Sequence, residues 1–255
     1  MDNLKIEKIQ YLLNNIHSLQ PFQILFYGSR QRKDHNENSD YNFFMIASAQ
    51  DQIRTGFITE VTEILESENK DATVTLITGD KDSIIYRMSI FEPTAVHLME
   101  LSEPIYGHKE FESLQTKWEE CKKKGNDTRE LIRYLENRSK FYRNINSKTT
   151  KDDISRIEKI LSLNIQSWVL EVVDDISITE IAFLDIPSRI TKLVKYLYKH
   201  QIPDDIHLLT SIYEEVHELK RSMRLLLDST EGKLDKLKDS ITFIKDLSKE
   251  IEKIV

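Results

Sequence analysis

A short polar stretch between two apolar runs contains residues that are suited to bind a phosphate group. Gly28 and Ser29 follow the apolar run from Ile24 to Tyr27, which predicts a buried strand. A glycine lets the backbone approach a phosphate closely, and a serine hydroxyl can donate a hydrogen bond to it. The free N–H groups at the start of a following helix also attract a phosphate. The sequence therefore predicts a phosphate-binding turn at residues 28 and 29.

Two polar residues at the start of the next apolar run are suited to bind a metal ion. Residues 39–42 read Ser-Asp-Tyr-Asn and lead into a second predicted strand that ends at Ala47. Because side chains alternate along a strand, Asp40 and Asn42 point to the same side. A cation such as Mg²⁺ held there would bridge to a phosphate on the turn. Residues 22–48 thus outline a site for a nucleoside triphosphate.

This order of motifs resembles the polymerase-beta-like nucleotidyltransferase superfamily, in particular its minimal and antibiotic-modifying branches. The family motif is Gly-Ser, a loop, Asp-x-Asp and a third acidic residue on a later strand. Residues 27–30 (Tyr-Gly-Ser-Arg) and residues 39–42 fall on that motif. The resemblance covers residues 1–106 by motif and order. Over residues 107–255 it rests only on helical character, which is similar in kind to that of kanamycin nucleotidyltransferase-like enzymes.

The resemblance implies an activity and a set of site residues. Family enzymes move a nucleoside monophosphate from a triphosphate onto a hydroxyl group, and their acidic residues hold two Mg²⁺ ions. By resemblance, Gly28, Ser29 and Arg30 would contact the nucleotide, and Asp40 would be a metal ligand. The other two acidic positions of the family correspond to Asn42 and to Thr75, which lies on a third predicted strand over residues 72–78.

Asn42 and Thr75 depart from the family pattern because both are neutral. Mg²⁺ prefers charged oxygen ligands, and a unit charge pair at 4 Å contributes roughly 4 kcal/mol at an effective dielectric near 20. Asp71 and Asp80, at the two ends of the third strand, are the carboxylates that could compensate. We therefore expect weak nucleotide binding, or a regulatory or interaction module. The alternatives are an active nucleotidyltransferase that modifies a hydroxyl of a small molecule or protein, and a helical partner-binding or dimerising protein.

The elements that must position these residues divide the chain into two parts. Residues 1–106 carry the strand-like runs, and we expect an α/β (α+β) domain with a short mixed sheet. In it, Asp51 is expected to cap one helix that continues to Leu65, Pro93 is expected to open a helix, and residues 103–107 to form an edge strand. Residues 83–90 fit either a helix or a strand. Residues 107–255 predict an all-helical bundle.

The helical part has two features with more than one interpretation. The helix over residues 129–143 concentrates basic and aromatic residues. These form either a surface that meets a triphosphate or RNA, or an amphipathic helix whose aromatics are core and whose arginines pair with Glu130 and Glu136. The apolar residues of the segment 234–254, which include Ile244 and Ile251, recur near a heptad spacing. They suit either a bundle helix or a homodimer contact.

Bulk properties exclude several classes of protein. The net charge of −7 argues against broad nucleic-acid binding. The single cysteine, Cys121, excludes an intramolecular disulfide and a cysteine zinc cluster, and we expect it to be inert. No apolar run is long enough to span a membrane, and the first ten residues lack a signal-peptide pattern. We expect a cytoplasmic protein.

Overall fold

The computed structural model describes residues 3–33, 39–125, 127–144, 150–173 and 176–199, together with Ser211 and Glu214. The chain forms two compact units, Met1–Asn126 and Asp127–Val255. The division falls after Asn126, whereas the sequence predicted a boundary after residue 106. Mixed α/β structure is confirmed in the first unit, and the described part of the second unit is helical.

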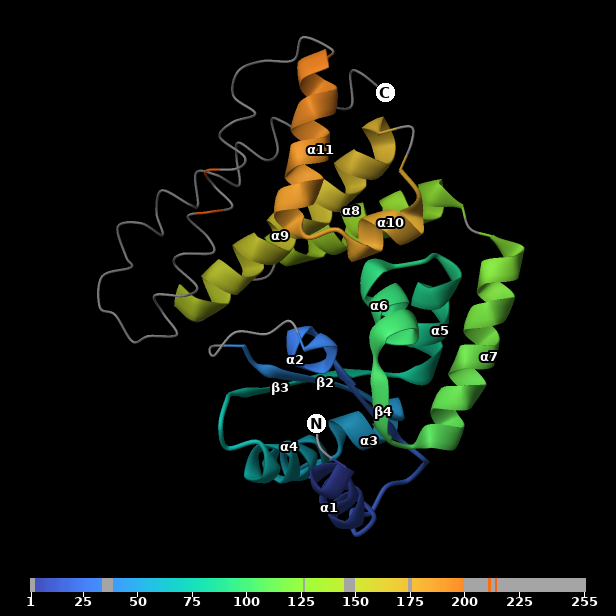
Figure 1. Ribbon diagram of the computed structural model, residues 1–255, viewed down its shortest axis with the longest axis vertical. Coiled ribbons are helices and arrows are strands. Elements are labelled where there is room, and N and C mark those ends of the chain that lie inside the picture. Colours follow the sequence, from blue (N-terminus) through green and yellow to red (C-terminus); the bar gives the residue numbers. More distant parts are fainter. Residues whose placement is uncertain are drawn as a thin grey trace. The chain divides into compact units, whose positions relative to one another are not determined.

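The first unit is built on a mixed four-stranded sheet with the order β3-β2-β1-β4 (Figure 1). The strands are β1 (Gln23–Tyr27), β2 (Tyr41–Ile46), β3 (Val74–Gly79) and β4 (Glu103–Tyr106). β1 pairs antiparallel with both β2 and β4, and β2 pairs parallel with β3. β4 is thus the edge strand that the sequence predicted. The order places the end of β1 beside the beginning of β2 and β3.

Two helices cover one face of the sheet. Figure 1 shows α1 (Asn3–Leu13) and α4 (Phe57–Glu68) on this side, where they contact each other. Their apolar residues Ile9, Leu13, Val61 and Leu65 are fully buried. They pack with strand residues of one parity in a core that also includes Ile24, Phe26, Phe43 and Met45. We call this the α1/α4 face.

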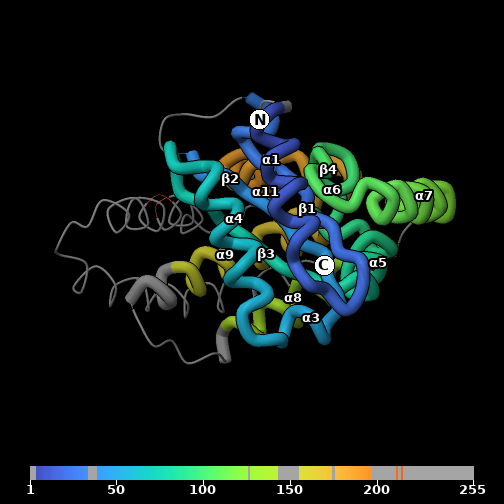
Figure 2. Tube along the Cα trace, turned by 90° about the horizontal axis from the view of Figure 1, so that it is seen from below, coloured from blue at the N-terminus to red at the C-terminus, as the bar shows by residue number. Residues whose placement is uncertain are grey.

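Three helices gather at the other side of the sheet. These are α5 (Lys81–Ser89), α6 (Pro93–Leu101) and α7 (His108–Lys124), which lie side by side in Figures 1 and 2. α6 and α7 both contact β1. Strand residues of the opposite parity, Leu25 and Phe44, are buried here, and Phe44 lies beside Ile84 where both approach Gly79. We call this the α5/α6 face.

Trp118 explains why α7 belongs to the first unit. Its indole is 1% exposed and lies 4.9 Å, between ring centroids, from Phe91. The indole N–H donates a hydrogen bond of 2.5 Å to Glu100 Oε1 on α6. Phe111 and Leu114 of α7 are also buried. The amphipathic pattern of α7 is therefore satisfied by the first unit, and Gly125 ends the helix with a positive φ of 74°.

We expect Trp118→Phe to lower the free energy of unfolding by about 1–2 kcal/mol, because it removes the indole hydrogen bond and part of a buried ring. Urea unfolding followed by circular dichroism measures this change. Glu112→Gln, on the exposed face of the same helix, should change the free energy by less than about 0.5 kcal/mol. Equal stability of the two variants would contradict the burial of Trp118.

The helix that Asp51 was expected to cap is in fact two helices, so that prediction was wrong. Ser48 caps α3 (Ala49–Ile53), and its hydroxyl oxygen accepts a hydrogen bond from the backbone N–H of Asp51. Arg54 is extended, and Gly56, with a φ of 89°, precedes α4. Asp51 itself is fully buried. Its carboxylate accepts hydrogen bonds from the backbone N–H groups of Leu19 and Gln20 and from the Ser48 hydroxyl.

The described part of the second unit contains α8 (Thr128–Asn144), α9 (Thr150–Val172), α10 (Ile178–Phe183) and α11 (Ile186–Lys199). α8 lies where the sequence predicted a helix over residues 129–143. The core of these helices includes Ile157, Leu161, Ile165 and Trp168 on α9. The apolar segment 234–254 lies outside the described residues. None of the helices that the structure describes is long and apolar enough to cross a membrane.

Candidate functional site

The predicted phosphate-binding turn lies between β1 and a short helix. Gly28 has a φ of 89°, a value that favours glycine, and it precedes α2 (Ser29–Arg32). The helix begins with a hydrogen bond of 3.1 Å from the backbone N–H of Arg32 to the carbonyl oxygen of Gly28. Ser29 is half-buried. A glycine turn and a helix start therefore lie at residues 28 and 29, where the sequence predicted a phosphate-binding turn, and phosphate binding there stays a prediction.

The sheet brings Gly28, Asn42 and Thr75 together on the α5/α6 face. Asn42 pairs with Tyr27 of β1 on one side and with Thr75 of β3 on the other. A Cβ atom added at Gly28 would lie 3.1 Å from Asn42 Nδ2, so the turn packs directly against this amide. Asn42 and Thr75 stand at the positions where the nucleotidyltransferase motif has carboxylates. They are neighbours in this sheet, and both side chains are neutral.

Asp40 lies at the entrance to β2, two residues before Asn42. It is half-buried, and its main-chain oxygen accepts a hydrogen bond of 3.4 Å from Asn42 Nδ2. The first bond of the β2–β3 ladder follows at once, from the backbone N–H of Tyr41 to the carbonyl oxygen of Thr73, at 2.8 Å. The position of Asp40 is thus tied to the same end of the sheet as the turn.

Arg30 does not extend over the α5/α6 face. Its side chain is 10% exposed. Its guanidinium carbon lies 4.3 Å from the ring centroid of Tyr41, which packs against the core of the α1/α4 face. Nε donates a hydrogen bond of 2.6 Å to the carbonyl oxygen of Ser39, and Nη1 donates one of 3.3 Å to Asp71 Oδ2. The guanidinium is therefore engaged on the opposite side of β2 from Asn42.

The two carboxylates that could compensate for Asn42 and Thr75 are engaged in other contacts. Burial pushes the pKa of Asp71 upward, but its own backbone N–H, the Tyr41 hydroxyl, Lys5 and Arg30 outweigh this and hold it below its usual value. Lys5 Nζ lies 3.8 Å from the Asp71 carboxylate. Asp80 caps α5 and accepts a hydrogen bond of 2.9 Å from the backbone N–H of Ser83.

Sequence reasoning missed Tyr27 and Arg87 on the α5/α6 face. Burial raises the pKa of Tyr27 to about 12, and the positive charge of Arg87 opposes part of that rise. A cation from α5 thus lies near the strand residue that pairs with Asn42. Arg87 also forms a 2.7 Å ion pair with Glu92, which caps α6. The helix over residues 81–89 was detectable from Asp80, which is a strong N-cap residue.

Three side chains at this end of the sheet have oxygen atoms that could bind a cation, and only one of them is a carboxylate. They are one carboxylate, Asp40, one amide, Asn42, and one hydroxyl, Thr75. Mg²⁺ commonly keeps several waters and binds through one or two carboxylates together with substrate phosphates. Among the residues that the structure describes, no group of three or more His, Cys, Asp or Glu side chains is arranged to hold a metal ion.

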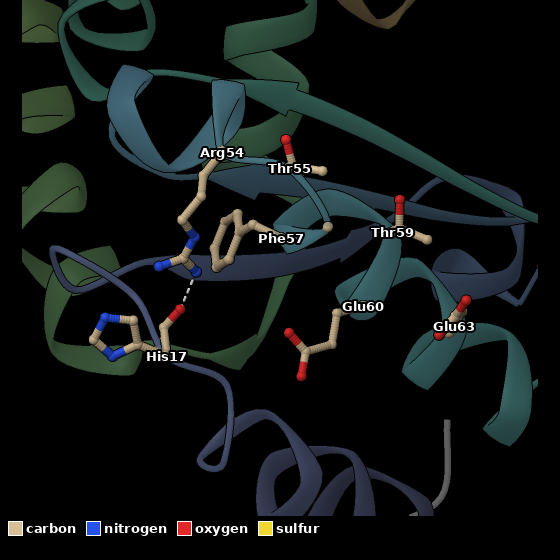
Figure 3. Close-up of a pocket in the computed structure, with 8 residues that line it drawn as sticks. His17, Arg54, Thr55, Phe57, Thr59, Glu60 and Glu63 are labelled. Carbon is tan, nitrogen blue, oxygen red and sulfur yellow. Dashed lines mark hydrogen bonds between the residues drawn. The ribbon is translucent and has the colours of Figure 1, made fainter.

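A shallow pocket of about 540 Å³ lies at the other end of the sheet, where the chain enters β1 and leaves β2 (Figure 3). It is lined by His17, the segment Arg54–Phe57, and Thr59, Glu60 and Glu63 of α4. The Arg54 guanidinium stacks on the ring of Phe57, 5.0 Å from its centroid, and donates a hydrogen bond to the carbonyl oxygen of His17. These contacts fasten the segment before β1 to the α3–α4 junction.

The basic helix α8 matches neither of its two interpretations completely. Leu131 and Leu135 are buried, whereas Phe141 is 56% exposed. Glu136 was expected to pair with an arginine, but it lies 4.0 Å from Lys140 Nζ instead. Arg138 instead donates a hydrogen bond to the Tyr142 hydroxyl, at 3.2 Å. The leucines thus form the core-facing side of α8, as expected of an amphipathic helix.

A comparison with protein-family models and a comparison with curated proteins each found no match for this sequence.

Proposed function

We propose that this chain is a nucleotidyltransferase-like protein that binds a nucleoside triphosphate weakly and acts as a regulatory or interaction module. The observation that carries the proposal is the packing of the Gly28 turn against Asn42, with Thr75 beside it in the ladder. The turn and a single carboxylate, Asp40, lie at one end of the sheet, and the neutral residues Asn42 and Thr75 occupy paired positions on β2 and β3 there.

Each residue has a defined part in the proposed binding. The backbone N–H groups at the start of α2 and the Ser29 hydroxyl would contact phosphate oxygens. Asp40 would hold one Mg²⁺ that also binds these phosphates. The Asn42 amide oxygen would join it only after the side chain turns, because Nδ2 now faces the turn and the Asp40 main chain. A single carboxylate leaves most of the ion's charge to be balanced by the nucleotide. The metal would therefore strengthen nucleotide binding only modestly.

The test is a calorimetric titration with ATP, with and without Mg²⁺. We expect a dissociation constant above about 100 µM, which corresponds to less than about 5.5 kcal/mol of binding free energy. We also expect no consumption of ATP when hydroxyl-bearing acceptors are added. Micromolar affinity together with ATP consumption would contradict the weakened site and favour an active enzyme. No detectable binding at 5 mM ATP would contradict nucleotide binding altogether.

We expect Gly28→Ala to reduce ATP affinity at least about tenfold, because a Cβ there meets the Asn42 amide and strains the turn. Gly56→Ala is the matched control. Gly56 has the same φ of 89°, but an added Cβ has no atom within 4 Å. Both variants should lose stability, and Gly28→Ala should lose more, because its ψ of −165° and its contact with Asn42 add to the strain. Only Gly28→Ala should lose affinity. Equal affinity in both, measured by the same titration, would remove the turn from the binding site.

A further inference from the structure

Arg30 contacts both sequence neighbours of Asp40. Its Nε bonds to the carbonyl oxygen of Ser39, and its guanidinium stacks on the ring of Tyr41. Its Nη1 reaches Asp71, which precedes β3, and the Tyr41 hydroxyl donates a 3.1 Å hydrogen bond to the same carboxylate oxygen. One side chain thus joins the phosphate turn, both residues that flank Asp40, and the entrance to β3.

We infer that Arg30, Tyr41 and Asp71 form a clamp that positions Asp40 for Mg²⁺–nucleotide binding, an inference that rests on the proposed function. Arg30 is a positioning residue in this arrangement and does not contact the phosphates. Its guanidinium is planar and offers donors in fixed directions, so it can bond to Ser39 and Asp71 while it stacks on Tyr41. A lysine has one flexible charged group and cannot reproduce this set of contacts.

Lys5 of α1 completes the clamp from the helix side. Its Nζ lies 4.9 Å from the centroid of the Tyr41 ring, and it forms an ion pair with Asp71. Tyr41 is therefore held by two cations, and Asp71 neutralises part of their charge. Because the backbone between Ser39 and Tyr41 is fixed on both sides, the Asp40 backbone has little freedom to shift away from the turn. The clamp lies on the α1/α4 face and the ligand site on the α5/α6 face, so the two act through β2.

The test compares Arg30→Lys and Asp71→Asn with Glu68→Gln. Glu68 forms a 2.8 Å ion pair with Lys8, another lysine of α1, and so provides a matched control. ATP affinity is measured with Mg²⁺ and with EDTA, and hydrogen exchange reports protection of the β2 amides. We expect both clamp variants to reduce the Mg²⁺-dependent gain in affinity at least about fivefold and to lower protection at residues 41–43. Glu68→Gln should leave both unchanged.

A double-mutant comparison separates positioning from general stability. If Arg30 acts through Asp40, Arg30→Lys should have no further effect on the Mg²⁺-dependent gain in an Asp40→Asn background. Additive losses there would overturn the inference, as would an unchanged gain in both clamp variants. If instead the unmodified protein gains no affinity from Mg²⁺, the proposed metal-assisted binding fails, and the inference fails with it. Urea unfolding shows whether each variant is folded. If Arg30→Lys does not fold, Asp71→Asn takes its place in the double-mutant comparison.

Discussion

Replacing Asn42 with aspartate is expected to tighten Mg²⁺–ATP binding on the order of a hundredfold. The new carboxylate would lie beside Thr75 and against the Gly28 turn, on the same side of β2 as Asp40. A unit charge pair at 4 Å contributes about 4 kcal/mol at an effective dielectric near 20, and desolvation of the carboxylate removes part of this. Thr75→Asp, added to Asn42→Asp, should tighten binding again.

Calorimetry with Mg²⁺–ATP measures these gains. Asn14→Asp and Thr59→Asp add the same charges on exposed positions at the other end of the sheet and should leave affinity unchanged. The Asn42→Asp, Thr75→Asp protein should also be assayed for transfer of a nucleotide to hydroxyl compounds. Failure of both substitutions to improve Mg²⁺ affinity would mean that these two positions do not face a metal site, and the resemblance would then lose its main support.

Replacing Asp51 with alanine is expected to lower the free energy of unfolding by about 3–4 kcal/mol. The carboxylate is fully buried and holds the backbone of Leu19 and Gln20 against α3. Its removal leaves these donors and the Ser48 hydroxyl without their acceptor at a partly buried place. Urea unfolding at neutral pH measures the loss. Asp82→Asn, an exposed carboxylate in the first turn of α5, should cost less than about 0.5 kcal/mol.

The loss of unfolding free energy in Asp51→Ala should depend on pH. Burial pushes the pKa of Asp51 upward, but the bonds from Leu19, Ser48 and Gln20 and the charge of Arg54 outweigh it and hold the pKa below the ordinary 3.8. A carboxyl whose pKa is lower in the folded state stabilises the fold above its unfolded pKa. That contribution disappears as pH falls through the folded value. The stabilities of the original protein and of Asp51→Ala should therefore differ most above about pH 5 and converge toward acid. A constant difference would contradict an ionised Asp51.

The sequence predicted the strands around the turn because their signals are local. β1 and β2 are apolar runs that are bounded by a glycine turn and by polar residues, and both were found within a residue or two. The Asp51 prediction failed because a helical spacing of apolar residues continues across Arg54 and Gly56, where the backbone is not helical. Nothing in the spacing reveals that Gly56 has a positive φ.

The candidate site could be predicted only in part. The sequence placed Asn42 and Thr75 on two predicted strands, and both strands are present, with these residues paired across β2 and β3. The direction of Arg30 could not be predicted, because it depends on Tyr41 and Asp71, whose proximity is set by the parallel pairing of β2 and β3. The place of α7 depends likewise on the contact between Trp118 and Glu100, which lie on different helices.

The order of strands has a consequence for how the protein folds as it is synthesised. β1 is an inner strand whose two partners emerge far apart, β2 within about 20 residues and β4 only after residue 103. Contacts between distant residues form slowly, and a strand with one free edge exposes unpaired backbone. The first unit can close only when β4 and α7 have left the ribosome, roughly a hundred residues after β1. Until then the sheet lacks β4, and one edge of β1 stays unpaired, which makes this stage of synthesis the most prone to aggregation.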